Sequence, residues 1–93
     1  GRVAGIVRAR DEQDAIALAN ATRFGLGASI WTQDSERGEA VARQIEAGAV
    51  FVNAQVASDV RMPFGGIKAS GLGRELGEHG IREFCNVKSL WVA

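Results

Sequence analysis

The 93 residues suffice for one small domain, and 46% hydrophobic with 24% charged residues is the composition of an ordinary globular chain rather than a disordered one. Eleven basic and eleven acidic side chains cancel, so no net charge favours nucleic acid or an anionic membrane as a partner. No apolar run approaches the roughly 18 residues of a membrane-spanning helix and no signal peptide is recognisable, which predicts a cytoplasmic protein.

Strands alternate with helices in the first half of the chain. Short apolar runs predict strands, and stretches with apolar residues at helical spacing predict the helices between them. The strands are expected at residues 3–8, 28–32 and 49–52, and the helices at residues 11–22 and from about 34 to 48. This βαβαβ order predicts an α/β fold with a parallel sheet, in which the carboxyl ends of the strands are the place for ligand-binding groups.

Capping residues support the bounds of both helices. Asp11 precedes the first helix, and Asp34 or Ser35 opens the second; each side chain offers an oxygen to the unpaired amides of a first turn. Gly25 and Gly48 are expected to end the two helices in the left-handed conformation that glycine adopts without strain.

The periodicity disappears between Asn53 and about residue 73, and this long loop is expected to carry function. It contains Pro63 and a cluster of glycines, which are typical of unusual backbone conformations. A helix is expected over residues 74–86 and a last strand over residues 88–92. That strand would lie at a sheet edge, and so small a domain has a thin core, so pairing with a second copy is expected.

The single Cys85 excludes an internal disulfide, and with the single His79 it falls short of the four ligands of a structural zinc site. Cys85 lies between apolar and polar neighbours on the expected packed face of the last helix, which predicts a buried, inert thiol. His79 is expected to be solvated or to cap that helix.

Polar residues after the third strand have two readings each. Asn53 either terminates the strand as a turn former or presents its amide at the ligand-binding edge of the sheet. Ser58, Asp59 and Arg61 either belong to a solvated loop or bring a hydroxyl and a guanidinium fork to a carboxylate.

Residues 63–75 read PFGGIKASGLGRE and resemble the signature PFGGxKxSGxGRE near the C-terminus of NAD(P)-dependent aldehyde dehydrogenases. Three further segments resemble the same family: residues 1–7 the stretch after its EEFGP motif, residues 20–26 its AN...YGLxA stretch, and residues 48–53 its GxVxVN strand. The resemblance covers essentially the whole chain, as the last part of a longer protein, in keeping with a start at Gly1 rather than Met. Residues 57–61 and 82–86 are most similar to bacterial succinate-semialdehyde dehydrogenases.

The resemblance implies that residues 1–87 are the C-terminal part of the catalytic domain and that residues 88–93 are an oligomerisation strand. The longer parent would oxidise an aldehyde, succinate semialdehyde by the narrower resemblance, with NAD or NADP. The family's GQxC nucleophile string and ELGG base string are absent from these residues. No catalytic, cofactor-binding or metal-binding residue is therefore assigned here, and the 93 residues alone are expected to be inactive and to bind no nucleotide.

The resemblance assigns substrate-binding roles to four residues. Asn53 would lie beside the active centre, Phe64 would form a wall of the aldehyde tunnel, and Ser58 would bind the distal carboxylate from the substrate-selecting loop of residues 54–61. Arg61, in the same loop, is the fourth. Two alternatives remain: an inactive structural or oligomerisation module, and an enzyme for another semialdehyde or an uncharged aldehyde.

Overall fold

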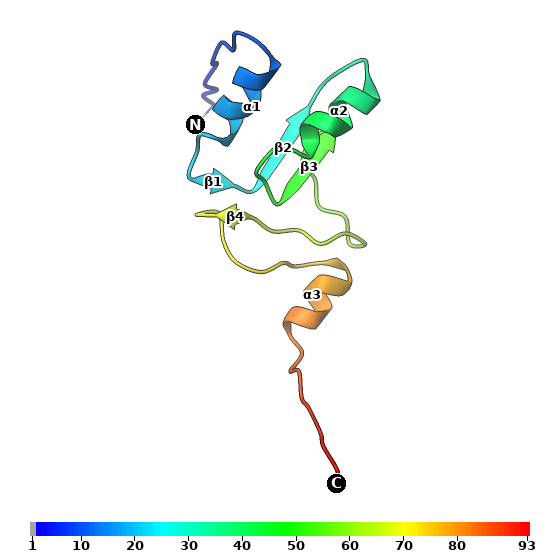
Figure 1. Cartoon of the computed structure of the whole chain (residues 1–93). Helices are drawn as coiled ribbons and strands as arrows, with labels where there is room; N and C mark the ends of the chain where they lie inside the picture. The colour runs from blue at the N-terminus through cyan, green and yellow to red at the C-terminus, as the bar shows by residue number, and fades with distance from the viewer. Residues whose placement is uncertain (1) are drawn as a thin grey trace.

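The structure, a computed structural model, describes residues 2–93; Gly1, where the expected catalytic-domain piece begins, lies outside the described residues. In chain order, the helices and strands of these residues are α1 (Glu12–Asn20), β1 (Phe24–Gly25), β2 (Gly27–Ile30), α2 (Ser35–Ala42), β3 (Ala49–Val52), β4 (Ile67–Lys68) and α3 (Gly77–Glu83) (Figure 1). No helix in the described part of the chain is long and apolar enough to cross a membrane.

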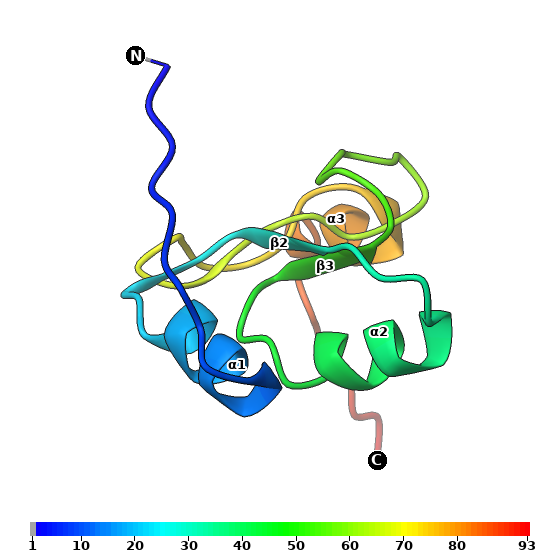
Figure 2. The same ribbon diagram turned by 90° about the horizontal axis from the view of Figure 1, so that it is seen from above.

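The centre of the fold is the unit β2–α2–β3. β2 and β3 pair in parallel, in register from Gly27 opposite Ala49 to Ile30 opposite Val52, and α2 forms the crossover between them. Helices α1 and α2 lie on one side of this sheet, whereas α3 and the loop after β3 lie on the other (Figure 2). The predicted α/β class with a parallel sheet is confirmed.

Local capping fixes where the first two helices begin, as predicted. The Asp11 carboxylate accepts a hydrogen bond from Asp14 N at 2.8 Å, and the Asp34 carboxylate accepts one from Arg37 N at 3.0 Å. Each bond satisfies an amide that the first helical turn leaves without a backbone partner.

The predicted role of Gly25 and Gly48 as left-handed helix terminators is wrong. α1 ends at Asn20 and α2 at Ala42, and neither glycine has a positive φ. Both are needed because other backbone passes close by. A Cβ on Gly25 would lie 2.7 Å from Glu46 O, and one on Gly48 would overlap the carbonyl oxygen of Gly65.

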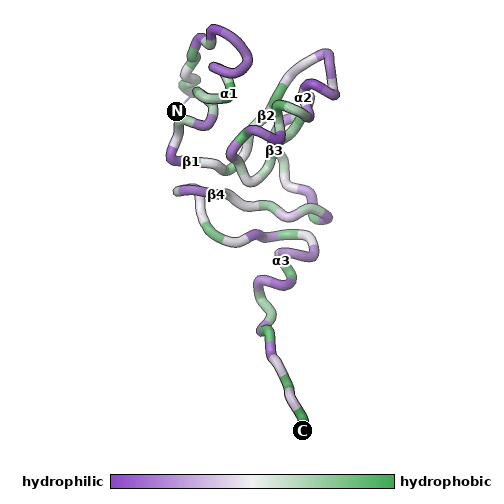
Figure 3. The backbone as a smooth tube through the Cα atoms, in the orientation of Figure 1, coloured by the Kyte–Doolittle hydropathy of each residue, from purple (hydrophilic) through white to green (hydrophobic). Residues whose placement is uncertain are grey.

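The strands predicted at residues 3–8 and 88–92 do not form, and this part of the prediction is wrong for the chain as described. Val3, Ile6 and Trp91 are 94%, 95% and 90% exposed. A strand exists only beside a hydrogen-bonded neighbour, and both sheets within residues 2–93 have two strands and no further partner for these segments. Figure 3 shows hydrophobic stretches along the C-terminal segment, which runs away from the rest of the fold.

The third helix is shorter than predicted, starting at Gly77 rather than residue 74. Leu76 and Gly77 have φ values of 63° and 60°, outside the right-handed helical region, so the chain turns sharply where α3 begins. Just ahead of this turn, Glu75 pairs with Phe64 in an antiparallel bridge, with N···O distances of 2.7 and 2.8 Å. The loop of residues 53–73 is therefore fastened to the start of α3.

The core is thin, as the length of the chain predicts. Ile16, 8% exposed, is the one buried hydrophobic side chain among the described residues. The radius of gyration is 17.1 Å, against about 12 Å for a compact domain of this length. Much apolar surface on this chain is therefore left without a cover.

Candidate functional site

The loop after β3 turns back along the sheet. It leaves the carboxyl end of β3 and returns on the side opposite α1 and α2 (Figures 1 and 2). Against the strand it encloses a small pocket of about 40 Å³, lined mainly by apolar side chains from both sides: Ala49, Phe51, Ala57, Asp59, Met62, Pro63 and Phe64. Phe64 is thus held against the face of β3.

Asn53 closes the sheet at its carboxyl end. Its φ of 54° lies in the left-handed region that asparagine tolerates better than most residues. Its backbone N donates to Ile30 O at 2.7 Å, and its Oδ1 accepts from Thr32 N at 2.8 Å. Asn53 therefore acts as a turn former that ties the ends of β2 and β3, and its substrate-binding role stays a prediction.

Arg61 makes a two-pronged contact with Asp59 in the same loop. Arg61 Nε lies 2.9 Å from Asp59 Oδ1, and Nη2 lies 2.6 Å from Oδ2. The guanidinium lowers the pKa of the Asp59 carboxyl below its ordinary value. A lowered pKa keeps the pair ionised at neutral pH, and its contribution is lost as the pH falls through that pKa.

The Asp59–Arg61 pair bears directly on carboxylate binding. Arg61 is largely exposed, with 83% of its side chain accessible. An arginine has five N–H donors, of which the two facing Asp59 are engaged. A substrate carboxylate therefore either uses the remaining donors or displaces Asp59.

The four predicted site residues are not brought to one point within residues 2–93. Phe64 lines the small pocket, Asn53 is bonded at the end of the sheet, and Ser58 and Arg61 are exposed in the loop. The loop packs against β3 on one side and is bonded to the start of α3, where Gly77 N donates to Val60 O at 3.0 Å.

The prediction that Cys85 is buried is wrong. It follows α3, its thiol is exposed, and its Sγ donates to Ile81 O at 3.4 Å. Nothing among residues 2–93 covers the apolar side chains at the end of α3, since Ile81 and Phe84 are exposed as well. His79 is exposed on α3, in agreement with the solvated alternative.

Sequence reasoning missed the polar side chains of the glycine-rich stretch. Arg74 Nη1 donates to Gly66 O at 2.9 Å and to Gly73 O at 2.7 Å, which braces the turn after Phe64. Lys68 reaches the C-terminal end of α1. One feature of the sequence could have pointed to this contact: α1 carries no basic residue in its last turn, where a cation is favoured, so a lysine from elsewhere in the chain could take that place.

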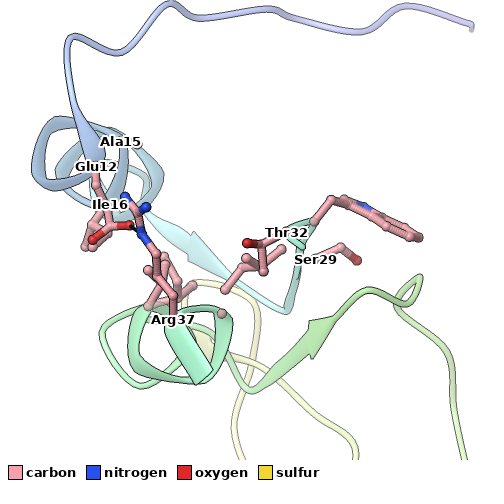
Figure 4. A pocket seen from close by; sticks show the side chains of 11 residues that line it. Glu12, Ala15, Ile16, Ser29, Thr32 and Arg37 are labelled. Atoms are coloured by element: carbon pink, nitrogen blue, oxygen red, sulfur yellow. Dashed lines mark hydrogen bonds and ion pairs between the residues drawn. The ribbon is translucent and has the colours of Figure 1, made fainter. Parts of the chain in front are cut away.

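A larger pocket of about 360 Å³ lies between α1, α2 and β2, on the other side of the sheet (Figure 4). Glu12 and Arg37 face each other across it as an ion pair at 2.5 Å. Its walls are otherwise mostly apolar, including Ile16, Ile30 and Val41. Its only charged groups neutralise each other, so we assign it no part in the chemistry.

The chain is similar to known proteins both in sequence and in structure. The model of the Aldehyde dehydrogenase family matches residues 1–90. Succinate-semialdehyde dehydrogenase [NADP(+)] 1 of Mycobacterium ulcerans (strain Agy99) is 55% identical over 92 residues, which are 99% of this chain and 20% of that relative. The chain therefore spans about a fifth of the length of this relative.

Two solved structures are similar over most of the chain. Succinic semialdehyde dehydrogenase from Streptococcus pyogenes, in complex with NADP+, has a TM-score of 0.83 and 43% identity, covering 88% of this chain and 18% of that one. Aldehyde dehydrogenase from Bacillus cereus, in an NAD+ complex, has a TM-score of 0.82 and 41% identity, covering 86% of this chain and 16% of that one. With a family model that matches nearly every residue, the chain belongs to the aldehyde dehydrogenase family.

Proposed function

We propose that this chain is the substrate-side part of an NAD(P)-dependent aldehyde dehydrogenase that oxidises succinate semialdehyde to succinate. The observation that carries the proposal is the loop of residues 54–66, which holds Phe64 against β3. The 55% identity with a succinate-semialdehyde dehydrogenase supports the choice of substrate. Both NADP- and NAD-complexed relatives are similar to this chain, so either nucleotide fits the proposal.

The described residues do not fit a nucleotide site of their own. α3 has 7 residues. Of the amides at its start, Gly77 N donates to Val60 O at 3.0 Å and Gly80 N to Leu76 O at 2.9 Å. Gly71 and Gly73 adopt positive φ values in the turn before it and form no phosphate-binding helix start.

The contribution of this chain would be to shape the aldehyde site and to recognise the distal carboxylate. Phe64 offers an apolar ring that keeps water away from the chain of the substrate. Ser58 offers a hydroxyl and Arg61 the N–H groups that Asp59 leaves free, which are the donors that a carboxylate needs once water is excluded.

The test is an assay of the full-length gene product that contains this sequence. We expect NAD(P)-dependent oxidation of succinate semialdehyde, with a higher kcat/KM than for uncharged aldehydes of similar length. The 93 residues expressed alone are the control, and we expect neither turnover nor saturable nucleotide binding in calorimetry. A full-length product without aldehyde oxidation, or micromolar NADP binding by the isolated chain, would contradict the proposal.

The uncovered apolar surface supports a second role, assembly into a homo-oligomer through residues 88–93. Leu90, Trp91 and Val92 are exposed, and the extended backbone there has no strand partner within residues 2–93. An unpaired apolar segment of this kind is suited to pairing with another chain.

We expect the isolated chain to self-associate at micromolar concentration in analytical ultracentrifugation. A chain truncated after Val87 should associate more weakly, because it lacks the proposed oligomerisation strand. A stable monomer at high micromolar concentration with sharp cooperative unfolding would contradict the prediction, as would equal association of the two chains.

A further inference from the structure

Lys68 makes contacts that the glycine-rich signature alone does not suggest. Its Nζ donates to Asn20 O, in the last residue of α1, at 2.9 Å and to Thr22 O, two residues further on, at 3.3 Å. The same Nζ lies 2.5 Å from Glu46 Oε2. Two of the three N–H donors of the ammonium group thus bond backbone oxygens, and the Glu46 carboxylate lies beside the group as its ion-pair partner.

The position of Lys68 suits a cation. A helix leaves its last carbonyls unpaired and carries partial negative charge at that end. α1 has no basic residue in its last turn, so Lys68 supplies the charge from a segment far away in the sequence. Its side chain is 25% exposed and that of Glu46 54%, against 65–76% for the partners of the ion pairs on α2 and α3, so water screens this pair somewhat less.

The backbone at Lys68 indicates that its place is held firmly. Its φ is 55°, a left-handed conformation that costs free energy for a lysine and persists where surrounding contacts enforce it. Those contacts include the pairing of β4 with β1, where Lys68 lies opposite Phe24, and the bond from Ala69 N to Arg23 O at 2.9 Å.

Glu46 is itself set in place by α1. Asn20 Nδ2 donates to Gln44 O at 2.8 Å, and Asn20 Oδ1 accepts from Glu46 N at 2.8 Å. The same asparagine thus presents its backbone carbonyl to Lys68 and positions the carboxylate that pairs with Lys68.

Ser70, two residues after Lys68, adds a hydrogen bond between this turn and β1. Its Oγ accepts from Gly25 N at 2.9 Å. A Cβ on Gly66 would lie 2.5 Å from Ser70 Cβ, so this turn packs against the segment that directly follows Phe64. We call Lys68, Ser70, Asn20 and Glu46 the latch.

We propose that Lys68 and Ser70 are positioning residues of the substrate site: through the latch they hold Phe64 and the two following glycines against β3. The segment between Phe64 and Lys68 is three residues long, so a shift at the latch passes directly to the Phe64 ring. The inference rests on the proposed function, because only that function gives the Phe64 ring a substrate to contact. The hydrogen bonds and the ion pair of the latch all run between residues 20 and 70 of this chain, and we expect an effect confined to aldehyde binding.

The test compares variants of the full-length gene product well below their unfolding temperature. Lys68→Met should raise KM for succinate semialdehyde about tenfold, with kcat and the KM for nucleotide changed less than about twofold. Lys68→Arg should recover most of the loss. Arg43→Met, which removes an exposed ion pair with Glu39 on α2, is the control and should change nothing.

A readout independent of activity separates this inference from the proposed function. Amide hydrogen exchange in the peptide around Phe64 should quicken in Lys68→Met and in Ser70→Ala, and should stay at the parent rate in Arg43→Met. Exchange at the parent rate with unchanged KM would overturn the inference. A proportional loss of every kinetic parameter would also overturn the inference, as would failure of both latch variants to fold. Either result would mean that the latch contributes to global stability rather than to the position of Phe64. If the parent does not oxidise succinate semialdehyde, the proposed function fails while the exchange result still decides on the latch.

Discussion

Replacing Gly48 with alanine is expected to destabilise the fold by about 3 kcal/mol. The added Cβ would overlap the carbonyl oxygen of Gly65 and would lie 2.7 Å from Gly65 C and 3.1 Å from Gly66 Cα. All of these are backbone atoms, so no side-chain rotation relieves the contact. Since Gly48 directly precedes β3, the strand and the return loop would have to separate. A fall in the unfolding temperature and in soluble yield of the full-length gene product measures the effect.

Gly38→Ala is the matched comparison, because Gly38 lies in the same β2–α2–β3 unit. Its Cβ would lie 2.7 Å from Val52 Cγ1 and 2.8 Å from Thr32 Cγ2, which are side-chain methyl groups rather than backbone atoms. Alanine in a helix also gains about 1 kcal/mol over glycine, which offsets part of the cost of shifting these two β-branched side chains. We expect a smaller loss for Gly38→Ala than for Gly48→Ala, and equal losses for the two variants would contradict the backbone explanation.

Ser58→Ala and Arg61→Ala are expected to lower kcat/KM for succinate semialdehyde in the full-length gene product while sparing an uncharged aldehyde of similar length. Loss of one donor to a desolvated charge costs about 1.5 to 3 kcal/mol, or about ten- to 150-fold in kcat/KM. Steady-state kinetics with the two aldehydes measures the difference. A loop that only supports the fold would lose both activities together.

Asp59→Asn is expected to improve the binding of succinate semialdehyde, the opposite of the effect expected for Ser58→Ala and Arg61→Ala. Asp59 occupies two donors of Arg61, at 2.9 and 2.6 Å, and competes with a substrate carboxylate for them. Removing its charge should lower KM for succinate semialdehyde and leave the uncharged aldehyde unaffected. Equal losses on both substrates in the alanine variants, or no loss on either, would contradict carboxylate recognition by this loop.

Features that depend on neighbouring residues were predictable from the sequence. Asp11 and Asp34 begin helices where a carboxylate precedes a helical pattern, because capping is a local contact. The parallel pairing of β2 and β3 follows from the spacing of two apolar runs around a helix. Asn53 was correctly placed at the end of β3, and its bond to Thr32 N supports the turn-forming alternative.

Features that depend on distant or absent partners were not predictable. β1 and β4 have two residues each, too few for a periodic pattern. They pair with Phe24 opposite Lys68 and Gly25 opposite Ile67, and Ser70 Oγ accepts a bond from Gly25 N beside them. Residues 3–8 have a strand-like sequence but no neighbouring strand within the described chain. Cys85 looks like a core residue because its helix is apolar on that side, yet burial also requires a surface to pack against.

Residues 54–66 are proposed to form the substrate side of an aldehyde dehydrogenase site, and a crystal structure of the full-length gene product with bound succinate tests this claim most directly. We predict a carboxylate oxygen of succinate at hydrogen-bond distance, about 2.7–3.0 Å, from Ser58 Oγ, with the Phe64 ring lining the same cavity. Succinate held entirely by other parts of the protein, with Ser58 and Phe64 out of contact with it, would contradict the claim.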